Sequence, residues 1–148
     1  MRLVEVCVVL TLLPGAPVFA ARQSIPSTQE LAGLEARAAL APPERQCLLY
    51  ARLVRSLTDL AVTEMRTGEE EQASNALRSA QDYVSAINMR DAKNAKKLKD
   101  AEILIRESAF RIRALLMDAP LEDRPALASV LKQLDNVESA LLMRVMAH

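Results

Sequence analysis

Apolar residues recur every three or four positions along most of this chain, which is the spacing of one face of an α-helix. The clearest example runs from residue 43 to 67. Its apolar stripe consists of Cys47, Ala51, Val54, Leu57, Ala61 and Met65. Its opposite, polar face consists of Arg52, Arg55, Asp59, Thr63 and Arg66. The pattern predicts an amphipathic helix of about six turns.

Signals for helix ends divide the first half of the chain. Ser27 and Glu30 have the spacing of a capping box, in which each side chain binds a free backbone amide of the other residue, so a first helix is expected over 28–41. Pro42-Pro43 ends it, because the residue before a proline avoids helical geometry. Gly68 ends the second helix, since glycine readily takes the left-handed conformation that terminates helices.

The second half predicts more helix, with one boundary left open. An apolar stripe begins at Ala73 and reaches Ile87, and a second begins at Leu98 in the same helical phase. Residues 69–117 therefore form either one long helix or two helices with a short polar turn near 89–94. A last helix opens at Asp123-Arg124-Pro125. Its apolar seam, which predicts a core-facing side, is Leu127, Val130, Leu134, Val137, Leu141 and Val145.

The amino terminus reads as an export signal rather than as part of the fold. Arg2 precedes the short apolar run Val6–Leu13, and Val18-Phe19-Ala20 offers small residues for cleavage near Ala20. The run is too short to span a membrane, which takes about 20 apolar residues. We expect a signal peptide at 1–20, a linker at 21–27 and one domain at 28–148, located in the periplasm or secreted.

Composition favours helices over strands. The 148 residues include two Phe, two Tyr, no Trp and only three Gly, so small aliphatic residues must fill the core and few tight turns are available. The fold class expected is therefore all-α, a bundle of four to five amphipathic helices arranged as αα-hairpins.

Charge is balanced overall, with 19 basic and 19 acidic residues. Net charge thus predicts no polyanion partner, and without aromatic residues beside the lysines there is no platform on which nucleobases stack. The segment 90–113 is locally basic. A basic face for binding a partner protein is therefore predicted at Lys96, Lys97, Lys99, Arg111, Arg113 and Arg124.

Residues for the common catalytic and metal-binding chemistries are scarce. The only histidine is the terminal His148, and neither a Cys-x-x-Cys nor a Glu-x-x-His motif is present. We expect no cofactor, no metal and no enzymatic activity. Acidic groups such as Glu69–Glu71 stand where helix capping explains them.

After cleavage Cys47 is the only cysteine. Apolar helical neighbours favour a buried, inert thiol. The alternative is a thiol available for an intermolecular disulfide.

Two resemblances add to this picture. Leu57, Leu60, Ala61, Gly68, Ala73, Leu77 and Ala80 fall at the spacing of a tetratricopeptide repeat. Residues 57–80 therefore resemble one such helical hairpin, with departures at Glu64 and Ser85 and no second copy further along. Separately, residues 96–146 look like the C-terminal half of small exported bacterial helical proteins of unassigned function.

Together these patterns predict a non-catalytic exported bundle that binds another envelope protein, or itself, as an interaction or adaptor module. The alternatives are a periplasmic chaperone-like bundle, or a bundle that binds a small ligand or a metal through methionine sulfurs. An enzyme using only carboxylates, lysines and serines is the remaining class. No membrane span is expected in the mature chain.

Overall fold

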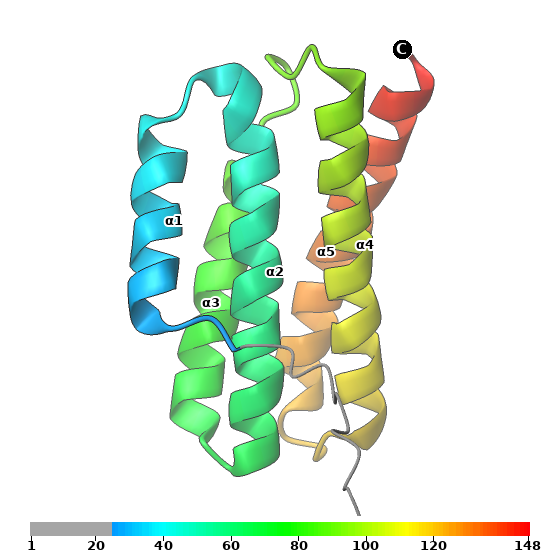
Figure 1. The fold of residues 1–148 in the computed structure, drawn as a ribbon. Helices are drawn as coiled ribbons and strands as arrows, with labels where there is room; N and C mark the ends of the chain where they lie inside the picture. Colours follow the sequence, from blue (N-terminus) through cyan, green and yellow to red (C-terminus); the bar gives the residue numbers. More distant parts are fainter. Residues whose placement is uncertain (1–24) are drawn as a thin grey trace, which may run out of the picture.

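The computed structural model describes residues 25–148, and this part of the chain contains five α-helices and no strand (Figure 1). The helices are α1 (Thr28–Leu40), α2 (Pro43–Thr67), α3 (Glu70–Ala86), α4 (Ala95–Asp118) and α5 (Arg124–Met146). The predicted all-α bundle is confirmed. The expected signal peptide at 1–20 and most of the linker at 21–27 lie outside the described residues.

The predicted helix ends are present with the expected hydrogen bonds. The Ser27 amide donates to Glu30 Oε2 at 2.8 Å, and the Glu30 amide donates to Ser27 Oγ at 3.2 Å, which completes the capping box. Gly68 has a φ of 82°, the left-handed conformation that favours glycine, and the Glu69 amide that follows donates to the carbonyl of Glu64 at 2.8 Å. The α2–α3 turn is therefore closed by backbone bonds.

Residues 69–117 form two helices and not one, because α3 ends at Ala86 and α4 begins at Ala95. Asn94 caps α4 by accepting a hydrogen bond from the Lys97 amide at 3.1 Å, and Asn88 accepts one from the Arg90 amide at 2.9 Å. Ala92 is only 2% exposed and belongs to the main core. The connection is therefore anchored by packing as well as by turn-forming side chains.

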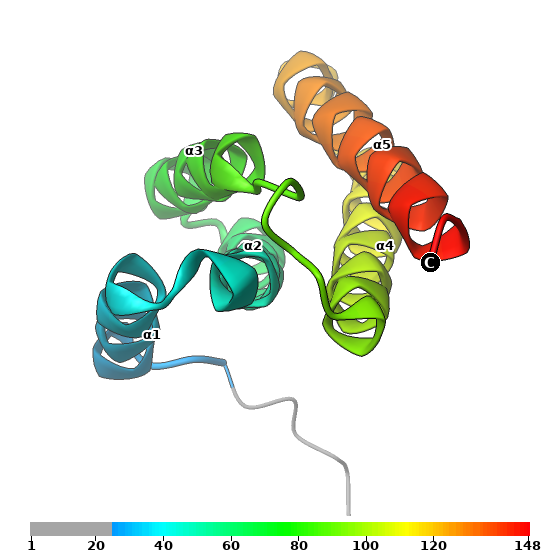
Figure 2. The ribbon, with the colours of Figure 1, turned by 90° about the horizontal axis from the view of Figure 1, so that it is seen from above.

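The helices alternate in direction along the long axis of the bundle (Figure 1). Seen from above, α2 lies between α1, α3 and α4, and α5 packs against α4 (Figure 2). Two antiparallel hairpins, α2–α3 and α4–α5, thus meet mainly through α2 and α4. The short α1 lies on the outside of α2.

One large apolar core joins the two hairpins. Its largest fully buried side chains in the second hairpin are Leu98, Ile105, Ile112, Leu127, Leu134 and Leu141. In α5 the predicted seam faces this core, with Val137 and Val145 partly buried at its margin. Each fully buried aliphatic side chain contributes roughly 1.5–3 kcal/mol, so this packing supplies most of the stability of the fold.

The helix α1 packs through two small clusters. Leu31 contacts the cluster of Leu57 and Ala80, and Leu34 and Ala38 contact that of Leu53. The rings of Tyr50 and Tyr83 stack beside these clusters with their centroids 5.8 Å apart. Burial raises the pKa of Tyr83, and its hydrogen bond to the Glu35 carboxylate of α1 raises it further.

No helix among residues 25–148 combines the length and apolar content needed to cross a bilayer.

Candidate interaction surfaces

The structure does not bring the six predicted basic residues into one face. Arg111 lies with Nη1 2.6 Å from Asp59 Oδ1, and Arg113 with Nη2 3.0 Å from Asp135 Oδ1. Arg124 donates from Nε to the carbonyl of Ala119 at 3.0 Å. These three guanidinium groups therefore bind partners within the bundle, at its middle and at the α4–α5 turn.

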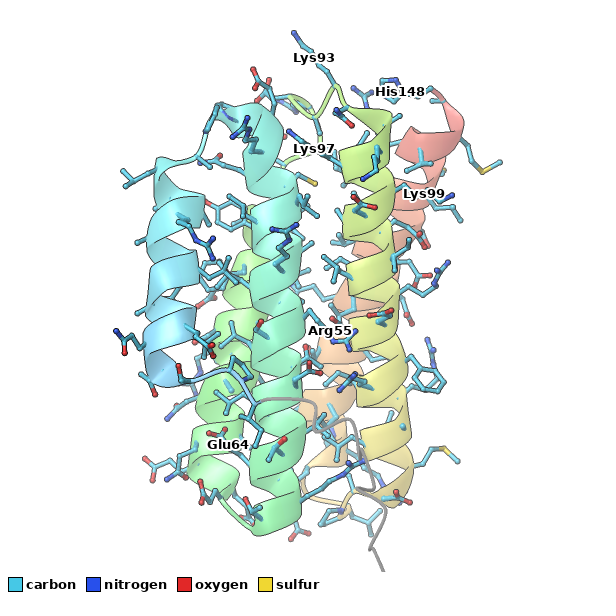
Figure 3. The ribbon with its side chains drawn as sticks, in the orientation of Figure 1. Arg55, Glu64, Lys93, Lys97, Lys99 and His148 are labelled. Atoms are coloured by element: carbon cyan, nitrogen blue, oxygen red, sulfur yellow. The ribbon has the colours of Figure 1, made fainter. Side chains whose placement is uncertain are left out.

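The three lysines lie together at the start of α4. Lys96 is exposed and its Nζ is 3.7 Å from Asp100 Oδ2, and Lys99 is also exposed. Lys97 is half-buried and lies between α4 and the N-terminal part of α2 (Figure 3). Of the six residues of the predicted basic face, only the three lysines therefore lie together.

A network of four charges joins the two hairpins at mid-height. Arg55 donates from Nε to both carboxylate oxygens of Asp59, at 3.2 and 3.1 Å, and its Nη1 pairs with Glu107 on α4. Arg111 of α4 binds the same Asp59. Three members of the network, Arg55, Glu107 and Arg111, line a hollow of about 690 Å³ between α2 and α4, and the exposed ring of Phe110 lines it too. Because each charge in the network has an opposite neighbour, its main role is to fix α2 against α4.

A second hollow, which we call the upper groove, lies between the end of α1, the start of α2 and the start of α4. It has a volume of about 630 Å³. Its apolar lining is Ala36, Leu40, Ala41, Pro42, Leu48 and Leu49, and its charged lining is Arg37, Arg45, Arg52 and Lys97. Leu40 is 87% exposed, an unusual degree for a large apolar side chain.

The four cations of the upper groove have no acid among their fellow lining residues. Within residues 25–148 none of them takes part in an ion pair. Like charges around an apolar floor repel one another and attract an anionic group that also carries apolar surface. The groove therefore has the chemistry of a binding surface for an acidic, partly apolar ligand.

Charge is also separated between the two ends of the bundle. The basic end comprises the α1–α2 turn, the α3–α4 connection and the C-terminus, with the adjoining helical turns. It carries seven bases and two acids, apart from the terminal carboxylate: Arg37, Arg45, Arg90, Lys93, Lys96, Lys97 and Arg144, with Glu44 and Asp91. The acidic end comprises the α2–α3 and α4–α5 turns with their adjoining helical turns. It carries seven acids and two bases: Glu64, Glu69, Glu70, Glu71, Asp118, Glu122 and Asp123, with Arg66 and Arg124.

Helix capping explains only part of this separation. Helix dipoles favour acids at amino termini and bases at carboxyl termini, by about 0.3–1 kcal/mol each, and each end of this bundle contains both kinds of terminus. Yet Lys96 and Lys97 stand in the first turn of α4, while Glu64 and Asp118 stand in the last turns of α2 and α4. At these four residues the sign of the charge follows the end of the molecule and not the helix terminus.

Glu64 shows the electrostatic cost at the acidic end. Burial raises the pKa of its carboxyl group, and the nearby charge of Glu69 raises it further. Its Oε2 atom is shielded from solvent without a hydrogen-bond partner. The ionised form is therefore disfavoured in the folded protein.

Cys47 is 2% exposed and belongs to the main core. Burial raises the pKa of its thiol to about 11, so the thiolate is absent at neutral pH. This agrees with the buried-thiol interpretation. It counts against the intermolecular disulfide, because such a bond requires the thiol to leave the core.

Reasoning from sequence missed Arg37, Arg45 and Arg52. Arg45 and Arg52 are seven residues apart, two helical turns, and their shared face of α2 was a usable signal. Arg37 and Lys97 join them only through the tertiary fold. The described residues hold no group of three or more His, Cys, Asp or Glu side chains placed to bind a metal.

Comparison with known proteins gives no relative: no family model, no curated protein and no solved structure matches this chain. The resemblances noted for residues 57–80 and 96–146 stay predictions.

Proposed function

We propose that this chain is a non-catalytic exported bundle that binds another protein of the cell envelope through the upper groove. The observation that carries the proposal is the set of four cations around an apolar floor, without acids in the lining. A purely structural bundle gains nothing from such an arrangement, since the like charges repel.

The groove chemistry describes the segment that it binds. The floor of Leu40, Leu48 and Leu49 takes an apolar side chain, and the surrounding Arg37, Arg45 and Arg52 take carboxylates. Arginine is suited to this role because its planar guanidinium group forms two parallel hydrogen bonds with a carboxylate. The partner segment is therefore acidic with one or more apolar anchors.

Site-specific crosslinking in the native envelope tests this function. A photoreactive residue replaces Leu49 in the groove, and a matched variant carries it at the exposed Arg78 of α3. We expect one dominant heterologous partner, identified by mass, from position 49 and not from position 78. Adding R45E and R52E should abolish that product.

Two results would contradict the proposal. One is equal capture at positions 49 and 78. The other is capture at position 49 of copies of this chain alone, or of nothing.

A further inference from the structure

We propose that copies of this chain associate end to end, with the basic end of one copy docked on the acidic end of the next. This inference goes beyond the proposed function, because it adds the acidic end and a second copy of the chain. Arg37, Arg45 and Lys97 belong both to the basic end and to the upper groove, but the apolar floor of the groove is not used. The ends lie at opposite poles of the long axis: Lys93, Lys97 and His148 lie near one pole, and Glu64 lies near the other (Figure 3).

The first support is charge complementarity within the molecule itself. Seven bases with two acids lie at one end, and seven acids with two bases lie at the other. All of these side chains are exposed except Lys97, Glu64 and Asp123, which are half-buried. Helix dipoles account for only part of this pattern, since Lys96 and Lys97 at one end and Glu64 and Asp118 at the other stand at unfavourable helix termini. A second copy supplies the opposite sign at both ends at once.

The second support is the position of exposed apolar side chains. Met143 and Met146 are 70% and 78% exposed at the basic end. Met117 and Leu121 are each 77% exposed at the acidic end. Each end thus combines charge of one sign with apolar surface to bury, the composition of a docking face.

An anionic membrane surface would explain fewer of these features than a second copy of the chain does. It explains the lysines and the exposed methionines of the basic end. It leaves the acidic end, with Met117 and Leu121, without a role. The second copy is therefore the occupant that the structure favours.

The geometry also sets the strength and form of the association. The acidic end, the smaller of the two, has four helix ends, each about 10 Å across, and offers roughly 300 Å² per partner. This area belongs to the class of weak, transient interfaces. A head-to-tail contact leaves one unused end of each sign, so it extends to short chains of copies and does not close as a symmetric dimer does. We expect an average mass that rises with protein concentration and falls with salt.

Sedimentation of paired charge-reversal variants tests the inference. The first variant carries R90E, K93E and K96E at the basic end, outside the lining of the upper groove, and the second carries E69K, E70K and E71K at the acidic end. All six side chains are exposed, so both variants should stay folded with the wild-type helices. The second variant should have a somewhat lower Tm, because it places positive charges at the N-terminus of α3. We expect each variant alone to be monomeric, with the association constant lowered at least about tenfold by like-charge repulsion.

Mixing the two variants is the decisive step. The first keeps its acidic end and the second keeps its basic end, so an equimolar mixture should form a one-to-one heterodimer that grows no further. A wild-type protein that stays monomeric at high concentration and low salt would overturn the inference, as would a mixture of variants without the heterodimer. Binding of wild type to vesicles of phosphatidylglycerol with phosphatidylcholine, lost only in the first variant and accompanied by no self-association, would assign the basic end to membranes instead.

Discussion

Charged residues are arranged in opposite ways in the middle of the bundle and at its two ends. At mid-height Arg55, Asp59, Glu107 and Arg111 alternate in sign across α2 and α4, and Arg113 pairs with Asp135 across α4 and α5. At the ends, residues of one sign accumulate. The difference shows that a neutral chain can pair its charges where the helices join and still gather charges of one sign at its ends.

The largest expected effect on stability comes from a substitution in the core at the middle of the bundle. Replacing Ile105, which is fully buried in α4, by Ala should lower the free energy of unfolding by about 2–5 kcal/mol because a cavity remains in the core. Urea denaturation followed by circular dichroism measures the change. Phe110→Ala is the control on the same helix, since that ring is 69% exposed and should cost far less. Equal losses would show that the core is not where the structure places it.

A smaller effect is expected from the charge network. Asp59→Asn removes the carboxylate that binds both Arg55 and Arg111, at 3.1 and 2.6 Å. We expect a loss of about 1–2 kcal/mol, because the hydrogen bonds involve charged groups but remain partly accessible to solvent. Asp100→Asn is the matched control, since its partner Lys96 has a side chain that is 88% exposed and that ion pair should contribute little. If both variants lose the same free energy of unfolding, the charges in the middle of the bundle are no more important for stability than those near its ends.

At the acidic end a substitution should stabilise. Glu64→Gln removes a negative charge from the last turn of α2, where the helix dipole disfavours it, and the expected gain is about 0.3–1 kcal/mol at neutral pH. Because the pKa of Glu64 is raised in the folded state, the stability linked to its protonation is present below the ordinary value of 4.5 and is lost as pH rises through the folded pKa.

The pH dependence of the stability gained by Glu64→Gln tests this prediction. The difference in Tm between Glu64→Gln and wild type should be largest near pH 7 and should shrink as the pH falls toward 4. A gain that does not change with pH would mean that the charge is not its cause.

The smallest expected effect on the fold concerns Cys47, which lies close to the basic end but inside the core. Nearby cations alone would lower its pKa, yet burial raises it to about 11. Labelling by a water-soluble thiol reagent at pH 8 should therefore be slow in the native protein and fast in denaturant. The linked stability is complete below pH 9 and is lost as pH rises through about 11. Fast native labelling would place the thiol at the surface.

The helices could be predicted because their signals are local. Helix ends are defined by hydrogen bonds within a few residues, at Ser27 with Glu30 and at Gly68. The apolar stripes of α2 and α5 directly predict which faces are buried. The break between α3 and α4 could not be decided in this way. The apolar phase continues across it, and the burial of Ala92 in the core is a tertiary contact.

The candidate surfaces depended on tertiary structure even more. Arg111 and Arg113 looked like surface charges because Asp59 and Asp135 are far away in sequence. Arg37, Arg45 and Lys97 come from three helices and meet only when α1, α2 and α4 pack. A list of charges along the chain therefore cannot separate a structural ion pair from a binding group.

The stacked tyrosines give this chain a built-in optical probe. The sequence has two Tyr and no Trp, and both tyrosines lie at the seam where α1 meets α2 and α3. Near-ultraviolet circular dichroism and tyrosine emission of the native protein therefore report on that one seam and are almost blind to the α4–α5 hairpin. Release of α1 would change these spectra while the far-ultraviolet signal of the remaining helices stays nearly constant, so a partial opening of the molecule can be observed without attaching any label.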